Sequence, residues 1–444
     1  MKKTLALILA LAMACTMFAC ATTPAPAVEA TPTDAAEAAT AEPAAEATQA
    51  PVDPATLSGS ITVWSSGEEL TRFVEGFNAV YPNIKVEVTV VPNSEFLTKL
   101  STAISGGEAP DLFTGESDYV KYLVETPYWT DLSQFGVDQY KDNIWEYVRN
   151  IGTDSKGVVK ALSWQASPGG IIYRRDIAKT VLGTDDPAAV AELLNSNAKM
   201  MEVAAKMSAA GIKMFATWQD IMNMEFTNRA SGWVTDGKLS IDANLSEYMD
   251  MAKTIVDNGY DKNCDPWSGE WYAAVESTDC FCYILPTWGY QFLIKPSAVT
   301  TSGQWGMCEA PVPYVKGGTW VGIYDGSQNK DLAWLFLQYC TLNEESVKAH
   351  ASQYGEYVAL KSVDEALAKE AGDAVLGGQN LYEFYNGVMA KIPADLMTQY
   401  DGTLNNAFLS AVKSYVSGAM TKDEAIAQFK ADALNAYPEL TIAE

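Results

Sequence analysis

The sequence predicts an α/β protein with more than one packing unit. Strand-like and helix-like segments alternate over 60–113, and longer helical segments follow from residue 187. The chain has 444 residues, which is more than one ordinary domain needs. A large core and at least two packing units are therefore expected.

The first twenty residues are typical of a bacterial signal peptide, with Lys2 and Lys3 followed by an apolar run over 5–13. Cys15 and Cys20 each follow small or apolar residues, as in the lipobox whose cysteine is lipidated after cleavage. Cys20 is the preferred lipidation site because a polar segment begins directly after it. Cys15, or an ordinary cleaved signal, remains the alternative.

Residues 21–57 form a predicted disordered linker of mostly Ala, Pro, Thr and Glu, without Lys, Arg or aromatic residues. The segment would tether a globular head to a membrane. No later apolar run is long enough to span a bilayer. The formal net charge of −26 argues against nucleic acid as a partner.

The head opens with a strand at 60–64 and a helix at 68–80, whose apolar residues recur at helical spacing. Apolar and polar residues alternate over 84–90, which predicts a half-buried strand. A helix over 96–107 and a third strand at 110–113 follow. Such alternation predicts a parallel sheet with right-handed crossovers.

Small ligands bind beyond the carboxyl ends of strands in such sheets. The loops after the first and third strands supply Ser66, Glu68, Glu116 and Asp118. Their carboxylates could accept hydrogen bonds from hydroxyl groups or hold a cation, although each alone could be a solvated loop charge.

Later segments are mostly helical. A buried strand is expected at 280–285, and the five cysteines of the head are odd in number, so they cannot all pair within one chain. A disulfide from Cys264 to Cys280 or Cys282 is possible, as are buried thiols. Helices are expected at 187–210, 245–258, 331–342, 381–389 and 404–416, with short strand-like segments over 305–324.

Five blocks in the same order resemble the extracellular solute-binding proteins of bacterial ABC importers, a family that includes maltose-type and other oligosaccharide binders. The resemblance covers about 59–436. The blocks are Ile61-Thr62-Val63-Trp64 to Ala109-Pro110-Asp111, Trp305-Gly306 with Ala310-Pro311-Val312-Pro313, Gly317-Gly318-Thr319-Trp320, Asn329-Lys330-Asp331-Leu332-Ala333-Trp334, and Gly418 to Ala425.

The resemblance implies a two-lobed, type II periplasmic-binding-protein-like fold, with hinge-linked lobes that each hold a mixed sheet flanked by helices. The first lobe is expected at 58–165 and 289–330, and the second at 166–288 and 331–444. It further implies an extracytoplasmic protein, expected to be a monomer, that delivers a solute, most simply a sugar, to an ABC permease, and the predicted lipidation would anchor it to the membrane.

Sugar binding needs flat apolar faces beside hydrogen-bonding groups. Trp288 matches the family position from which an aromatic ring faces the ligand, with a packed hinge position as the alternative. Trp164, Trp218 with Asp220, and Trp320 are further candidates for ligand contact, each with core packing as the alternative. Trp267 and Trp271 are expected to serve packing.

An enzyme is the alternative from another class. The only histidine, His350, is expected at the surface, and the sequence contains neither a G-x-S-x-G elbow nor a P-loop. No cofactor or metal is expected. A polyamine or a peptide could replace the sugar, and a surface carbohydrate-degrading enzyme would need only two carboxylates.

Overall fold

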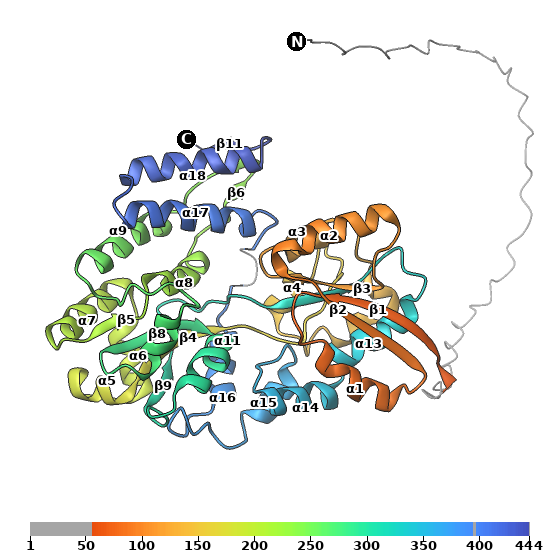
Figure 1. Ribbon diagram of the computed structural model, residues 1–444, viewed down its shortest axis with the longest axis horizontal. Helices are drawn as coiled ribbons and strands as arrows, with labels where there is room; N and C mark the ends of the chain where they lie inside the picture. Colours follow the sequence, from red (N-terminus) through yellow and green to blue (C-terminus); the bar gives the residue numbers. More distant parts are fainter. Residues whose placement is uncertain (1–55, 394–396, 444) are drawn as a thin grey trace, which may run out of the picture. The chain divides into compact units, whose positions relative to one another are not determined.

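The computed structural model describes residues 56–393 and 397–443. The signal peptide, Cys20 and nearly all of the linker lie outside these residues. Two four-stranded sheets, in the orders β10-β3-β1-β2 and β5-β8-β4-β9, organise the head, and a small sheet has the order β11-β7-β6 (Figure 1). In the described part of the chain no helix has the length and apolar character to cross a membrane.

The first lobe is built on the sheet β10-β3-β1-β2. β1 (Gly59–Ser65) lies parallel to β2 (Ile84–Val90) and β3 (Leu112–Glu116), and β10 (Thr319–Ile323) joins β3 in antiparallel register. α1 (Thr71–Val80) and α2 (Asn93–Gly106) are the crossovers, which confirms the predicted order of strands and helices. β10 makes the sheet mixed.

α13 (Lys330–Thr341) packs in the first lobe, where it contacts α1, β1 and β10. Its Phe336 packs edge-on against Phe77, and its Trp334 stacks on Phe135. This position differs from the assignment of 331–444 to the second lobe, because the apolar face of α13 completes the first core. The other helical segments here are α3 (Val120–Glu125), η2 (Leu132–Phe135), η3 (Val137–Tyr140), α4 (Glu146–Ile151), α14 (Glu344–Tyr354) and α15 (Lys361–Leu367).

The second lobe is built on the sheet β5-β8-β4-β9. β4 (Gly169–Arg174) pairs in antiparallel register with β8 (Cys280–Pro286) and with β9 (Trp305–Cys308), and β5 (Lys213–Phe215) lies parallel to β8. Every residue of β4, β8 and β9 is buried, as expected of 280–285. β9 thus belongs to the second lobe rather than to the first, where 289–330 had been placed, because it pairs with β4.

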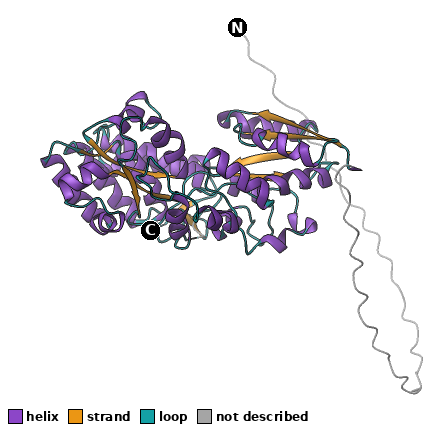
Figure 2. Cartoon of the chain, turned by 90° about the horizontal axis from the view of Figure 1, so that it is seen from below, coloured by secondary structure: helices purple, strands orange, loops and turns teal. Residues whose placement is uncertain are grey.

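Helices cover the strands of both large sheets (Figure 1 and Figure 2). The long helix expected over 187–210 is two helices, α6 (Pro187–Leu194) and α7 (Asn197–Ala209), because the Ser196 side chain accepts a hydrogen bond from Lys199 N and starts a new helix. The remaining elements of the second lobe are α5 (Arg175–Leu182), η4 (Trp218–Ile221), α8 (Met222–Thr227), β6 (Val234–Thr235), β7 (Lys238–Leu239), α9 (Ala243–Asp257), α10 (Gly269–Ala273), η5 (Ala274–Glu276), α16 (Leu381–Met389), α17 (Asp401–Val416), α18 (Lys422–Ala436) and β11 (Thr441–Ile442).

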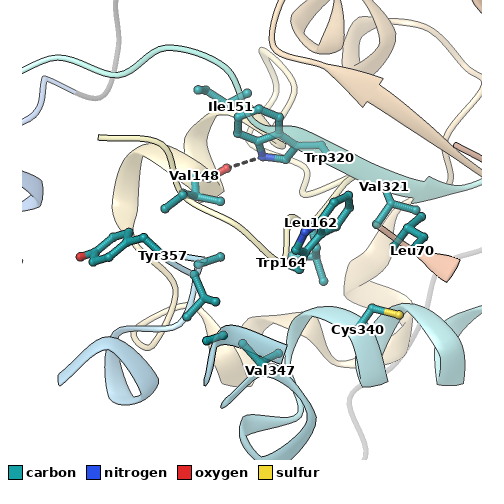
Figure 3. Close-up of a cluster of buried hydrophobic side chains, with 14 of the residues drawn as sticks. Leu70, Val148, Ile151, Leu162, Trp164, Trp320, Val321, Cys340, Val347 and Tyr357 are labelled. Atoms are coloured by element: carbon teal, nitrogen blue, oxygen red, sulfur yellow. Dashed lines mark hydrogen bonds between the residues drawn. The ribbon is translucent and has the colours of Figure 1, made fainter. Parts of the chain in front are cut away.

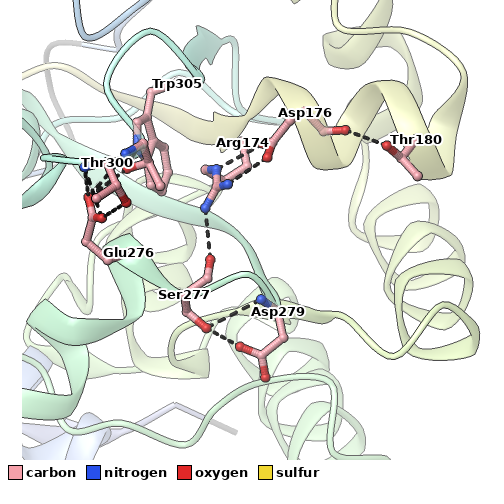
Figure 4. A network of polar contacts seen from close by, with 9 residues as sticks. Arg174, Asp176, Thr180, Glu276, Ser277, Asp279, Thr300 and Trp305 are labelled. Atoms are coloured by element: carbon pink, nitrogen blue, oxygen red, sulfur yellow. Dashed lines mark hydrogen bonds and ion pairs between the residues drawn. The ribbon is translucent and has the colours of Figure 1, made fainter.

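A polar network fixes the loop before β8 to the end of β4 (Figure 4). The Arg174 guanidinium binds both carboxylate oxygens of Asp176, at 2.9 and 2.7 Å, and donates to the Ser277 carbonyl at 2.8 Å. Its Cζ lies 5.7 Å from the ring centroid of Trp305 in β9. One buried cation therefore joins three parts of the second lobe.

Asp111 holds the first lobe together at the start of β3. Its Oδ2 accepts hydrogen bonds from the backbone N and the hydroxyl of Thr62, at 2.8 and 3.1 Å. Its Oδ1 accepts from Ser327 Oγ at 2.6 Å and from Asn329 Nδ2 at 3.2 Å. The buried carboxylate thus joins β1 to the segment that leads into α13, which explains an aspartate in the Ala109-Pro110-Asp111 block.

The substitution Asp111→Ala is expected to lower the free energy of unfolding by about 1 to 3 kcal/mol, because it leaves the Thr62 backbone N without this acceptor. Urea denaturation measures the change. The matched control is Asp432→Ala, which removes a partly exposed surface carboxylate that accepts a hydrogen bond from Gln428 and should shift stability by less than about 0.5 kcal/mol. Equal losses in the two variants would contradict the structural role of Asp111.

Candidate functional site

Three chain segments lie side by side between the two sheets. Residues 166–168 lead from the first lobe into β4, residue 287 follows β8, and 315–318 lead from β9 into β10. Thr287 N donates to the Pro168 carbonyl at 3.0 Å, and Lys316 N donates to the Ser167 carbonyl at 3.1 Å. Backbone hydrogen bonds therefore fix the place where the lobes meet.

Trp288 lies on this connection, at the start of the helical segment made of α11 (Thr287–Gly289), the π-helix η6 (Tyr290–Ile294) and α12 (Lys295–Ser297). Its indole Nε1 donates to the Lys316 carbonyl at 2.9 Å. A Cβ at Gly317 would lie 2.8 Å from that nitrogen, and Gly317 has a φ of +87°. Glycine is therefore required here for two reasons: the close approach and the left-handed backbone.

Trp267 stacks on Trp288, with ring centroids 5.3 Å apart and planes 21° from parallel. Trp267 is 55% exposed and has a φ of +68°, which is rare for a bulky residue. Strained backbone of this kind occurs most often where a side chain must be presented for function. Trp267 was predicted to serve packing, and the neighbouring Asp265-Pro266 pair is the one local sign of an unusual backbone.

A carboxylate network lies at the carboxyl ends of β1 and β3. Glu116 accepts a hydrogen bond from the Ser66 hydroxyl and a shared one from the Thr319 hydroxyl, whose Oγ1 lies 2.9 and 3.1 Å from the two carboxylate oxygens. Gln165 Nε2 donates to Thr319 Oγ1 at 3.1 Å. The sequence predicted that the loops carrying Ser66 and Glu116 would meet, and the structure joins these two side chains directly.

Burial raises the pKa of Glu116 from 4.5 to about 7, although the hydroxyls of Ser66 and Thr319 act in the opposite direction. The nearby charges of Glu69 and Asp118 raise this pKa further. A carboxyl group that titrates near neutral pH can both donate and accept hydrogen bonds, as sugar hydroxyls require.

The two other loop carboxylates predicted from sequence, Asp118 and Glu68, are more exposed to solvent than Glu116. Asp118 pairs with Lys316 Nζ at 3.1 Å, and both side chains are partly exposed. Glu68 is exposed, and its carbonyl accepts from Thr71 N at 3.0 Å at the start of α1. Asp118 therefore lies beside the connection between the lobes, whereas no contact joins Glu68 to the Glu116 network.

A cavity of about 60 Å³ lies between elements of both lobes. That volume accommodates about two water molecules, whereas ligand sites usually span about 300–1,000 Å³. Of the tryptophans and loop carboxylates predicted from sequence, only Asp118 lines it. Its lining residues are Ser117, Asp118, Tyr147, Ile151, Asn223, Phe226, Thr227, Arg229, Val315, Lys316, Gly317, Pro393, Met397, Asp401, Gly402 and Asn405.

Three of the tryptophans predicted to contact ligand are packed in the cores. Trp164 and Trp320 lie in the core of the first lobe (Figure 3), where Trp320 Nε1 donates to the Val148 carbonyl at 2.9 Å. Trp218 lies in the core of the second lobe. These positions differ from the prediction of ligand contact, because each ring fills space in a hydrophobic core.

Asp220 is also buried, and its carboxylate accepts from Trp271 Nε1 at 3.1 Å. Burial raises the pKa of Asp220 from 3.8 to about 8, while the bond from Trp271 lowers it. The carboxyl group therefore serves as a neutral internal partner of Trp271 near neutral pH, and it has no surface through which to reach a ligand in this conformation.

His350 is buried, contrary to the expected surface position. Its Nε2 lies 2.7 Å from Glu356 Oε2, and its ring stacks on Phe73 at 4.3 Å. All five described cysteines are free and buried, so neither disulfide considered for Cys264 is formed. Within 56–393 and 397–443, no three His, Cys, Asp or Glu side chains are grouped as metal ligands would be.

Residues 63–346 match the family of bacterial extracellular solute-binding proteins, and the chain belongs to this family. YcjN of Escherichia coli (strain K12), described as an ABC transporter periplasmic-binding protein, is 22% identical over 206 residues. The match covers 43% of this chain and 47% of YcjN, so it spans about half the length of that relative.

Solved structures share the fold. A family 1 extracellular solute-binding protein gives a TM-score of 0.74 at 17% identity, over 85% of this chain and 99% of its own. The galacto-N-biose/lacto-N-biose I-binding protein of Bifidobacterium longum, solved with lacto-N-biose, gives 0.70 at 16% identity, over 87% and 99%. The sugar-binding protein MalE of Xanthomonas citri gives 0.71 at 15%, over 86% and 98%. The fold is thus the two-lobed, periplasmic-binding-like α/β fold that the sequence predicted.

The raised pKa of Glu116 predicts a pH dependence of stability. Between pH 4.5 and about 7 the folded protein retains a proton that the unfolded chain releases, so the free energy of unfolding falls as pH rises through this window. Glu116→Gln should flatten this part of the curve, as measured by urea denaturation at pH 5 and pH 7.5. Equal pH slopes for wild type and variant would show that Glu116 ionises normally.

Proposed function

We propose that this protein captures a sugar or short oligosaccharide for an ABC importer. The observation that carries the proposal is that the Trp267–Trp288 stack and the Glu116 network are both bonded to one short segment. Segment 316–319 connects the two, because the Lys316 carbonyl accepts from Trp288 and the Thr319 hydroxyl donates to Glu116. An aromatic face with hydroxyl, amide and carboxyl groups close by has the chemistry that recognises a pyranose.

The exposed ring of Trp267 is the proposed stacking surface. Trp288 stacks on this ring and is itself fixed by the hydrogen bond from its Nε1 to the Lys316 carbonyl. Ser66, Gln165 and Thr319 supply groups that can exchange hydrogen bonds with ligand hydroxyls. Glu68 and Asp118 lie on the loops that carry Ser66 and Glu116, and they remain proposed ligand contacts.

Several proteins of this fold were solved with carbohydrates, which supports the ligand class. They include the lacto-N-biose complex of the B. longum protein and the β-1,6-galactobiose complex of a binding protein from B. animalis subsp. lactis. The second complex has a TM-score of 0.68 at 19% identity, over 87% of this chain and all of that one.

The cavity of about 60 Å³ between the lobes has no room for a disaccharide, so a sugar that reaches from the Trp267 face into this cavity would require the lobes to separate. In this proposal the ligand binds between the lobes and stabilises a closed form through contacts with both. The closed form docks to the transmembrane subunits of a permease, and no bond of the ligand is broken.

The proposed location is the outer face of the cell membrane. Cys20 would carry the lipid, and residues 21–57 would form the tether. The head is proposed to act as a monomer that requires no cofactor.

Trp267→Ala should abolish the rise in melting temperature that a bound sugar causes, because it removes the exposed stacking face. A sugar at 100 times its dissociation constant adds about 2.7 kcal/mol to the stability of the wild type. Thermal unfolding is measured with lacto-N-biose, β-1,6-galactobiose, maltose and spermidine. Trp288→Ala should have the same effect, since Trp267 loses its support.

The control is Tyr415→Ala. Tyr415 lies 13 residues after Gly402 in α17, about 20 Å along the helix axis, and its hydroxyl reaches only Asp250. This variant should keep the full response to sugar. A response to spermidine alone would indicate that the ligand is a polyamine rather than a sugar. Release of monosaccharides during incubation with the disaccharides would indicate that the protein is an enzyme.

A further inference from the structure

We propose that Gly402 determines how closely the two lobes approach each other. Gly402 lies in the first turn of α17 in the second lobe, and Asp118 follows β3 in the first lobe. A Cβ built on Gly402 would lie 1.7 Å from the Asp118 carbonyl oxygen, 2.7 Å from its carbonyl carbon and 3.3 Å from its Cα. Real Cβ atoms essentially never approach another heavy atom within 3.0 Å, so a side chain at this position would force a shift.

The second-lobe side of this contact is rigidly held. Asp401 is buried and accepts hydrogen bonds from the Arg229 guanidinium and from Thr398, whose N and Oγ1 lie 2.7 and 2.8 Å from Asp401 Oδ2. The Arg229 and Asp401 side chains are only 3% and 5% exposed. The first turn of α17 therefore cannot move away from Asp118 without breaking a buried ion pair.

The first-lobe side is held as well. Ser117 N donates to the Gly318 carbonyl at 2.9 Å, and Tyr119 N donates to the Glu116 carbonyl at 2.9 Å. These bonds fix the backbone on both sides of Asp118, and the ion pair with Lys316 adds a third connection. A side chain at position 402 would meet backbone rather than the flexible end of a side chain.

Asp118 and Gly402 also line the cavity between the lobes, together with Lys316 and Gly317. Because neither surface can yield locally, a methyl group at position 402 is accommodated by separation of the lobes. The absence of a side chain at Gly402 thus permits the closed form, and a methyl group there would lower its population and the apparent affinity for any ligand that binds this form. The inference rests on the proposed function in one respect: it assumes that the ligand binds between the two lobes.

Gly402→Ala tests this directly, without a ligand. Small-angle X-ray scattering of the full chain should give a larger radius of gyration for this variant than for the wild type. The matched control is Gly387→Ala: Gly387 also lies within a helix, α16, but a Cβ there has no neighbour within 4 Å. Its radius of gyration should equal that of the wild type.

Asp118→Ala separates the backbone contact from the side-chain ion pair, because it keeps the carbonyl and removes the carboxylate. This variant should also match the wild type in scattering. Equal radii for Gly402→Ala and wild type would overturn the proposal, as would opening caused by Asp118→Ala alone.

Urea denaturation of the same variants identifies a local rearrangement. Alanine favours helix over glycine by up to about 1 kcal/mol, so lobe separation should leave Gly402→Ala at least as stable as the wild type. A marked loss of stability with an unchanged radius would show that the first turn of α17 unfolds instead, and the proposal would be wrong. These outcomes do not depend on whether the ligand is a sugar.

Discussion

The backbone hydrogen bonds between the connecting segments are the interaction on which the site depends. Thr287 N binds the Pro168 carbonyl and Lys316 N binds the Ser167 carbonyl, so segments that are distant in sequence share one position between the sheets. Lys316 then holds Trp288, and the chain three residues further on brings Thr319 to Glu116. The aromatic stack and the carboxylate network are therefore parts of one arrangement rather than two separate features.

This arrangement contains two destabilising features that a region with a purely structural role would not need. Glu116 is desolvated without a cationic partner among its hydrogen-bond contacts, and Trp267 has a left-handed backbone and is 55% exposed. Both features lower stability compared with a polar loop and an apolar core. Their position beside the meeting point of the lobes favours a binding role, in agreement with the family to which the chain belongs.

Local patterns were sufficient to predict the first sheet, since β1, β2 and β3 follow alternation and helical spacing that are visible in the sequence. Local sequence patterns could not predict the lobe to which α13 and β9 belong, because that assignment depends on contacts between residues distant in sequence. In the site, loop position correctly brought Ser66 and Glu116 together. Exposure of the tryptophans was beyond prediction, because tertiary packing decides which ring is buried: Trp164 is 1% exposed and Trp267 is 55% exposed.

The most direct measurement of the central claim is a crystal structure of the protein with a bound disaccharide. A pyranose ring is expected against the exposed face of Trp267, at about 4 Å, with hydroxyl groups in hydrogen-bond contact with the network of Glu116, Ser66 and Thr319. Both lobes should contact the sugar. A sugar bound on the outer surface of one lobe, or one that contacts neither Trp267 nor this network, would contradict the proposed site.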